Sequence, residues 1–173
     1  MKTLIIVLTG SLIFPTINWA DTPSKKFQLT SPAFENNAGI PTRYTCDGGD
    51  VNPPLIFKNV PPHTKSLALT VSDPDAPEGL WSQWVVYNIP PNVGEIIENT
   101  NPGTEGLSDF GKYVYAGPCP SDDKLHHYIF RAFALNNFLY INEGPTLGEV
   151  EHALRSHTIT KTELIGTYQK SPI

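Results

Sequence analysis

The residues of this chain that could do chemistry gather in a few short stretches, and the first is V-S-D-P-D-A-P at 71–77. Asp73 and Asp75 stand two positions apart there. Residues two apart in an extended chain point the same way, and proline keeps this stretch out of a helix. The pair is compatible with an acid/base pair, a metal site, the rim of a ligand site or an ordinary turn. Asp-Pro-Asp on its own is a common turn composition.

The other candidate residues lie near predicted strands. Gln83 is an amide among apolar neighbours, where it needs a hydrogen-bonding partner. Two prolines stiffen the loop G-P-C-P at 117–120, and His126 and Tyr128 share one face of the strand that follows. If these strands are sheet neighbours, one small cleft forms in which imidazole, phenol and loop amides offer donors to an anion. Asp73 would then hold the histidine.

Each of these residues also has an ordinary structural interpretation. Gln83 alone suits a buried hydrogen-bonding residue, and His126 alone suits a core or capping role. The neighbouring His127 points to the opposite face of the strand, so both histidines cannot bind one metal. Trp81 and Trp84 are predicted to be core residues.

The elements that must position these residues are mostly strands. Alternating or continuous apolar runs predict strands at 65–73, 81–89, 126–135 and 158–168. In the second run, Ile89 is expected on the face of Val85 and Tyr87, opposite Trp84 and Val86. The 17 prolines and 13 glycines are spread between short segments, as in a mainly β protein. We expect two antiparallel sheets in a sandwich, or a closed barrel-like variant.

One helix is clearly marked near the C-terminus. Thr146 followed by Glu149 forms a capping box, and Leu147, Val150 and Leu154 contribute to an apolar stripe. These signals predict a helix over 147–156.

The first twenty residues have the order of a secretory signal peptide. Lys2 precedes an interrupted apolar stretch over 4–17, and Ala20 ends the segment. We expect cleavage after Ala20, a periplasmic or secreted product and a single domain over 21–173.

A formal net charge of −5 and the absence of a basic run argue against nucleic acid as a partner.

The two cysteines and the absence of common enzyme motifs limit the kinds of site that the chain can form. Cys46 and Cys119 do not form a CxxC pair, and in an exported protein they are expected to form one disulfide, with two buried thiols as the alternative. The sequence lacks the G-x-S-x-G, H-E-x-x-H and Gly-rich phosphate-loop motifs. A metal site from Asp73, Asp75 and His126 is conceivable, but no ligand spacing demands it.

Taken together, several motifs resemble the phosphatidylethanolamine-binding protein family, specifically its bacterial Raf-kinase-inhibitor-like branch. D-P-D-A-P is weak alone, but G-P-C-P and H-H-Y-I-F follow at the family's spacing. The matching stretches cover essentially the whole chain after the leader. They are T-S-P-A-F (30–34), R-Y-T-C-D-G (43–48), N-P-P-L (52–55), V-P-P-H-T-K-S-L-A-L (60–69), D-P-D-A-P (73–77), W-V-V-Y-N-I-P (84–90), D-F-G-K (109–112), G-P-C-P (117–120), H-H-Y-I-F (126–130) and L-I-G-T-Y (164–168).

The resemblance implies a fold of two antiparallel β-sheets with a few peripheral helices, and a small pocket for anionic groups such as phosphate or a phospholipid head group. It also implies a disulfide between Cys46 and Cys119. The implied roles are a histidine-orienting group for Asp73, a wall for Asp75 and Pro77, a rim for Gly117 and Pro118, and a lining for His126 and Tyr128.

Gln83 departs from the family pattern, which usually has histidine at this position. Glutamine keeps a donor and an acceptor but cannot gain a charge near neutral pH. We therefore expect weaker and less pH-sensitive anion binding, or a preference for a neutral polar ligand.

Three functions follow from these observations. The first is an exported, non-catalytic binding protein for phosphate-bearing or phospholipid head-group-like ligands. The second is a protein-interaction or inhibitor module acting on a periplasmic hydrolase or another partner. The third is a hydrolase that uses Asp73 and His126, for which no nucleophile with an adjacent base is visible. No cofactor, resident metal or membrane span after the leader is expected.

Overall fold

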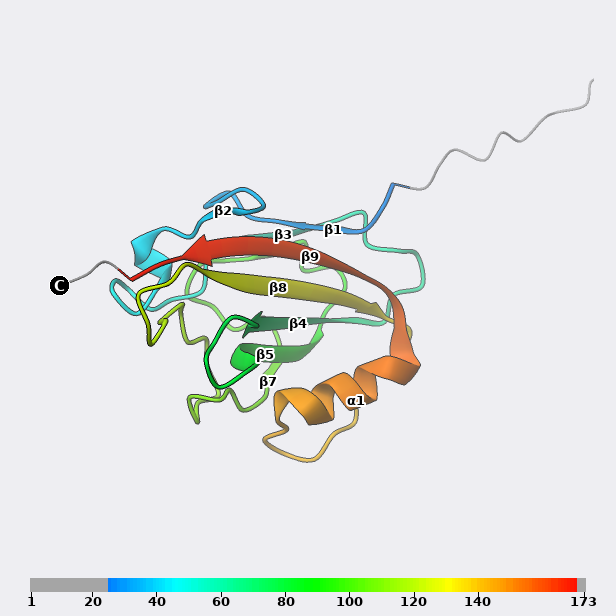
Figure 1. Ribbon diagram of the computed structural model, residues 1–173. Coiled ribbons are helices and arrows are strands. Elements are labelled where there is room, and N and C mark those ends of the chain that lie inside the picture. Colours follow the sequence, from blue (N-terminus) through cyan, green and yellow to red (C-terminus); the bar gives the residue numbers. More distant parts are fainter. Residues whose placement is uncertain (1–24, 171–173) are drawn as a thin grey trace, which may run out of the picture.

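The computed structural model describes residues 25–170, which form two β-sheets and one α-helix (Figure 1). The expected leader and its cleavage site lie outside these residues. The three-stranded sheet has the order β1-β3-β6, and the six-stranded sheet has the order β2-β9-β8-β4-β5-β7. The strands are β1 (Gln28–Thr30), β2 (Ala38–Gly39), β3 (Leu55–Lys58), β4 (Ser66–Asp73), β5 (Trp81–Ile89), β6 (Glu95–Ile96), β7 (Thr104–Glu105), β8 (His126–Leu135) and β9 (Thr158–Tyr168).

The predicted mainly β fold of two sheets with a helix near the C-terminus is confirmed. The four predicted strands are β4, β5, β8 and β9, and only β4 differs in its bounds, beginning at Ser66. The sheets are antiparallel with one exception, because the short β2 pairs parallel to the end of β9. A 3-10 helix, η1, covers Thr42–Tyr44.

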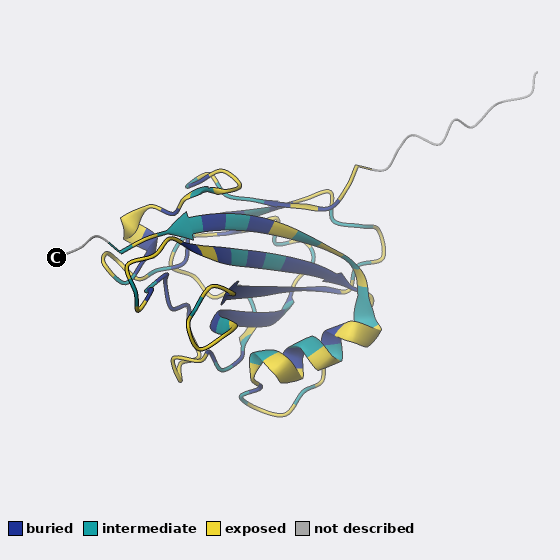
Figure 2. Ribbon diagram, in the orientation of Figure 1, coloured by how far each residue is buried: buried dark blue, intermediate teal, exposed yellow. Residues whose placement is uncertain are grey.

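The core forms two layers, one on each face of the six-stranded sheet. Between the two sheets lie large side chains such as Leu55, Phe57 and Phe130. On the opposite face, Val85 and Phe133 pack against Val150 of the helix α1. Strand β4 lies in the middle of the sheet, and every one of its residues is buried (Figure 2). Side chains at the end of β4 are therefore fixed by packing on both faces.

One predicted strand face was wrong. Ile89 packs in the same core as Trp84 and Val86, while Val85 and Tyr87 face the helix. The two-residue alternation fails because Asn88 adopts a left-handed conformation, with φ of 56°, and the pairing of β4 with β5 shifts register there. A β-bulge of this kind turns the following side chain to the other face of the sheet.

The helix α1 (Leu147–His157) begins where the capping box predicted. The backbone N–H of Glu149 donates to Oγ1 of Thr146 at 3.4 Å, and the Thr146 N–H donates to Oε2 of Glu149 at 2.8 Å. Val150 and Leu154 point into the core, and the helix covers one face of β5 and β8. Within residues 25–170, no helix has the length and apolar character needed to cross a membrane.

Candidate functional site

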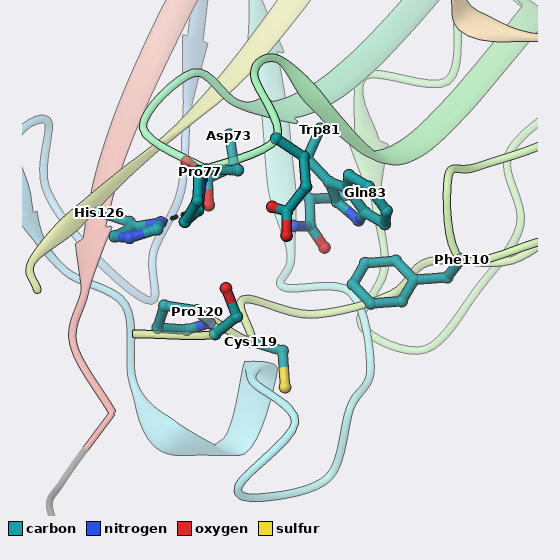
Figure 3. A pocket seen from close by; sticks show the side chains of 11 residues that line it. Asp73, Pro77, Trp81, Gln83, Phe110, Cys119, Pro120 and His126 are labelled. Atoms are coloured by element: carbon teal, nitrogen blue, oxygen red, sulfur yellow. Dashed lines mark hydrogen bonds and ion pairs between the residues drawn. The ribbon is translucent and has the colours of Figure 1, made fainter. Parts of the chain in front are cut away.

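A small cavity lies at the end of the six-stranded sheet where β4 ends and β5 and β8 begin. Because β4 pairs antiparallel with both neighbours, Asp73 is opposite Trp81, and Ser72 is opposite Ile129. The cavity has a volume of about 130 Å³, and the predicted residues Asp73, Pro77, Gln83 and His126 line it (Figure 3). The topology therefore brings together groups that are far apart in the sequence.

His126 lies between two carboxylates. Its Nδ1 is 2.7 Å from Oδ2 of Asp73, and its Nε2 is 2.9 Å from Oδ1 of Asp122. Ionised carboxylates only accept hydrogen bonds, so both contacts are satisfied together when the ring is protonated and both of its nitrogens donate. Burial favours the neutral ring, but the hydrogen bonds to Asp73 and then Asp122 outweigh it, and the pKa of His126 is raised above its ordinary value. The predicted contact between Asp73 and His126 is confirmed.

The two acids of the Asp-Pro-Asp stretch face different partners. The N–H of Asp75 donates to Oδ1 of Asp73 at 2.8 Å, which closes a turn. The Asp75 carboxylate accepts from the backbone N–H of His127 at 2.8 Å and lies 2.7 Å from its ring Nδ1. This ring contact lowers the pKa of Asp75, against the opposing effect of burial.

The expectation that both acids point the same way was therefore wrong, because the chain leaves the extended conformation immediately after Asp73. Asp75 does not lie among the residues that line the cavity, whereas Pro77 does. His127 is exposed, as predicted for the opposite face of the strand.

Gln83 has its hydrogen-bonding partners on the loop that precedes β8. When its amide is oriented by these partners, its Nε2 donates to the carbonyl oxygens of Ala116 at 2.7 Å and Gly117 at 3.2 Å. The predicted need for a buried partner is confirmed, and Gln83 is only 2% exposed. The side chain thus lines the cavity while it fixes the loop behind it.

Gly117 and Pro118 do not line the cavity, but they hold in place the loop that does. Gly117 is tightly packed, since a Cβ atom there would lie 2.5 Å from the carbonyl oxygen of Tyr44. The Pro118 carbonyl accepts from the N–H of Cys46 at 3.1 Å. The expected disulfide joins Cys46 to Cys119 with a Cα–Cα distance of 5.4 Å, and Cys119 lines the cavity. This loop is therefore bound to the η1 region covalently and by hydrogen bonds.

Tyr128 is fully buried behind His126. Its ring centroid lies 6.5 Å from that of the imidazole in a stacked arrangement, and its hydroxyl has no hydrogen-bond partner among the described residues. Burial, and next the Asp73 carboxylate, raise the pKa of this phenol, so it stays protonated. Tyr128 does not line the cavity, and its predicted ligand contact stays a prediction.

Several residues in or beside the cavity were not predicted to lie there. Trp81, expected in the core, is half-buried and packs edge-on against Phe110 at 5.7 Å between ring centroids. Glu78 lines the cavity from the loop after β4. Asp122 reaches His126 from a turn, and the local signal for that turn is the run S-D-D-K just before β8. Trp84, in contrast, is a core residue as predicted.

The charges around the cavity are mixed. His126 is the one side chain of the lining that can carry a positive charge, while Asp73 and Glu78 are acidic. Asp122 adds a carboxylate beside His126, and its pKa is lowered chiefly by the backbone N–H of Lys124. Within residues 25–170, no group of three or more His, Cys, Asp or Glu side chains is arranged to hold a metal ion. The cavity therefore combines carboxylates with one imidazole.

The fold and the site together define a mainly β sandwich with one small polar cavity at the strand ends. The sequence profile of the phosphatidylethanolamine-binding protein family matches residues 30–169. The chain belongs to this family.

Individual relatives and structures agree with this assignment. The chain is 45% identical over 150 residues to a UPF0098 protein of Chlamydia pneumoniae, covering 83% of this chain and 99% of that protein. It is 38% identical over 181 residues to the UPF0098 protein PH1269 of Pyrococcus horikoshii, covering 98% and 91%.

Two solved structures are similar over most of the chain. The phosphatidylethanolamine-binding protein homolog CT736 from Chlamydia trachomatis matches with a TM-score of 0.80 and 42% identity, over 84% of this chain and 98% of that one. YbcL of E. coli, described as a new member of the mammalian family, matches with a TM-score of 0.79 and 31% identity, over 85% and 100%.

Proposed function

We propose that this chain is an exported, non-catalytic binding protein whose cavity takes a small phosphate-bearing ligand of the phospholipid head-group type. The observation that carries this proposal is the position of the His126 ring, which Asp73 holds at one edge of a cavity that also contains Glu78. The volume of about 130 Å³ is below the range of roughly 300–1,000 Å³ for drug-sized ligands, so a head group fits and an acyl chain does not.

The phosphate is expected to compete with Asp122 for His126. Asp122 is partly exposed, and its carboxylate occupies the Nε2 position that a ligand oxygen would need. Asp73 is buried and holds Nδ1, so it keeps the ring in place while Asp122 is displaced. A phosphate oxygen at Nε2 would then form a charge-assisted hydrogen bond of the same kind.

Glu78 makes a zwitterionic ligand more suitable than a simple anion. Asp73 and Glu78 repel an isolated phosphate, but a carboxylate attracts the ammonium group of an ethanolamine-type head group. The faces and edges of Trp81 and Phe110 provide an aromatic wall on the same cavity, and aromatic faces attract ammonium groups.

The same contacts support a non-catalytic role. A general base must be accessible to the substrate, and carboxylates occupy both nitrogens of His126. Ser121 is a lining hydroxyl, and the hydrogen bonds of the described residues include none between it and His126. Without an activated nucleophile, ester hydrolysis is not the favoured chemistry.

Export is supported by the N-terminal pattern and by the disulfide, since disulfides persist mainly in oxidising compartments. Cell fractionation followed by N-terminal sequencing tests this part of the proposal. The expected mature chain begins at Asp21 and is found in the periplasm or medium. A cytoplasmic chain that retains Met1 would contradict it.

Titration calorimetry with glycerophosphoethanolamine, inorganic phosphate and ethanolamine tests the ligand class. We expect the first to bind most tightly, because it can engage His126 and Glu78 together. Asp73→Asn should weaken both phosphate ligands, whereas Glu78→Gln should weaken the two ammonium ligands, glycerophosphoethanolamine and ethanolamine, and should not weaken inorganic phosphate. Asp123→Asn is the matched control, because Asp123 is exposed and does not line the cavity. The absence of binding by all three compounds, or binding insensitive to both cavity variants, would reject the proposal.

A further inference from the structure

A second recessed surface lies at the opposite end of the six-stranded sheet, where β9 begins after α1 (Figure 1). It has a volume of about 720 Å³ and is formed by residues 25–27, 59–62 and 159–162. We call it the lysine groove because Lys25, Lys26 and Lys161 line it and no acidic residue does. This is an unusual concentration of positive charge on a chain of net charge −5.

One side of the lysine groove is the edge of β9, which β1 approaches but does not pair with. Strand β9 pairs with β8 along its length, but its other side meets β2 only at Gly166 and Thr167. The carbonyls of Ile165 and Thr167 accept hydrogen bonds on that side, from Asn37 and Ile40. By the two-residue period of a strand, Lys161 and Glu163 direct their backbone groups to the same side, where no strand of residues 25–170 pairs with them.

The other walls of the lysine groove are fixed in place. The carbonyl of Lys26 accepts from Nδ2 of Asn59 at 3.0 Å, and the carbonyl of Pro61 accepts from Oγ1 of Thr64 at 2.7 Å. Pro61 and Pro62 further stiffen this loop. Apolar contact area is available at Val60 and at Ile159, which is 43% exposed. A preformed wall lowers the entropic cost of binding a chain segment.

From this geometry we infer that the lysine groove binds an extended acidic segment of a partner protein, which adds as a strand to the unpaired edge of β9 where the groove exposes it. The unpaired backbone supplies main-chain hydrogen bonds, and the lysines select carboxylates on the incoming strand. Glu163 does not oppose this, because its carboxylate is paired with Arg131 at 2.7 Å. Self-pairing of two copies is disfavoured, since it brings lysines of both edges together. The inference is independent of the ligand proposed for the cavity.

A labelled heptapeptide of alternating valine and glutamate tests this inference by fluorescence anisotropy with the full chain. We expect saturable binding that weakens with salt, and no binding of the corresponding valine–lysine peptide. Lys161→Glu should weaken binding by roughly tenfold, because an attraction becomes a repulsion. Lys112→Glu is the matched control, as Lys112 is exposed in a loop outside the groove, and its effect should stay below about twofold.

A peptide methylated on alternate backbone nitrogens separates strand addition from simple charge attraction. It keeps its carboxylates but loses main-chain donors, so strand addition predicts that its binding is lost. Equal binding of both peptides would overturn the inference. So would binding to phosphatidylglycerol vesicles in the absence of peptide binding, or a Lys161-dependent dimer in sedimentation experiments, which would assign the surface to lipid or to a second copy.

Discussion

The cavity at one end of the six-stranded sheet and the lysine groove at the other differ in what their polar groups contact. In the cavity, both ring nitrogens of His126 and both oxygens of Asp73 have hydrogen-bond partners within the protein. In the lysine groove, the ion pairs of the described residues leave out Lys25, Lys26 and Lys161. No strand of residues 25–170 pairs with the part of the β9 edge that lines the groove.

The cavity residues should therefore help to stabilise the fold, whereas the residues of the lysine groove should not. A buried charge network is strongly destabilised when one member is removed, because its partner is left uncompensated. Exposed charges and an exposed strand edge contribute little to the free energy of unfolding. Substitutions in the cavity should therefore change stability and ligand binding together. Substitutions in the lysine groove should change partner binding alone.

The largest effect is expected from the disulfide, which attaches the cavity loop to the η1 region. Closing a loop of this length contributes roughly 4 kcal/mol in the chain-entropy model. Replacing both Cys46 and Cys119 by alanine should lower the free energy of unfolding by about this amount in guanidinium titrations. Reductant should reproduce the loss in the wild type and leave the double variant unchanged. If neither treatment shifts the transition, the loop does not depend on this bond.

Asp73→Ala is expected to have the next largest effect. It removes the buried partner of His126 and the acceptor for the Asp75 N–H, and should lower the free energy of unfolding by about 3 kcal/mol. Glycerophosphoethanolamine binding should be lost, while the valine–glutamate peptide still binds to the folded fraction with unchanged affinity. A stability equal to that of Asp123→Ala would show that the hydrogen bonds of Asp73 do not contribute to the free energy of unfolding.

Gln83→His tests the departure from the family pattern. A histidine here can gain a proton, so inorganic phosphate should bind roughly tenfold more tightly than to the wild type at pH 5. The gain should disappear by pH 8, where an ordinary histidine is neutral. Calorimetry at both pH values measures the difference. Equal affinities of the two proteins throughout this range would reject the prediction.

Asp122→Ala gives the smallest stability effect and tests the competition at His126. Because the variant removes a partly exposed carboxylate from Nε2, phosphate should bind several-fold more tightly, by roughly the strength of one exposed ion pair. The variant should also lower the pKa of His126, since one of the two supporting hydrogen bonds is gone. NMR titration of the imidazole measures this pKa, with Asp123→Ala as control. A weaker phosphate affinity in the variant would show that Asp122 belongs to the ligand site.

The raised pKa of His126 also predicts how stability changes with pH. The folded chain binds this proton more tightly than the unfolded chain, so the contribution is fully present below about pH 6.5, the ordinary histidine value. It is lost as pH rises through the higher folded-state pKa. Denaturant midpoints of the wild type should therefore fall over this window more than those of Asp122→Ala.

Local sequence patterns were sufficient to predict the long strands and the helix of this fold. Alternation predicted the faces of β4 and β8, and the Thr146–Glu149 pair predicted the start of α1. The side of Ile89 was wrong because the conformation of Asn88 is a local backbone choice that asparagine tolerates but does not require. The parallel pairing of β2 with β9 leaves no pattern in a two-residue strand.

The site was predictable where strands determine it and not where loops do. Asp73 and His126 end and begin neighbouring central strands, so their meeting follows once the strands pair. Asp75 is directed away by a turn, and Glu78, Phe110 and Asp122 come from loops whose paths depend on distant contacts. The lysine groove is formed by three segments that are far apart in the sequence, and no local pattern predicts it.

The most direct test of the central claim is amide chemical-shift mapping of the wild-type chain during titration with glycerophosphoethanolamine. The account predicts saturable shifts clustered at Asp73, Gln83, Ser121 and His126, with no shifts at residues 25–27 or 159–162. Shifts that cluster at the lysine groove, or no saturable shifts anywhere, would contradict it.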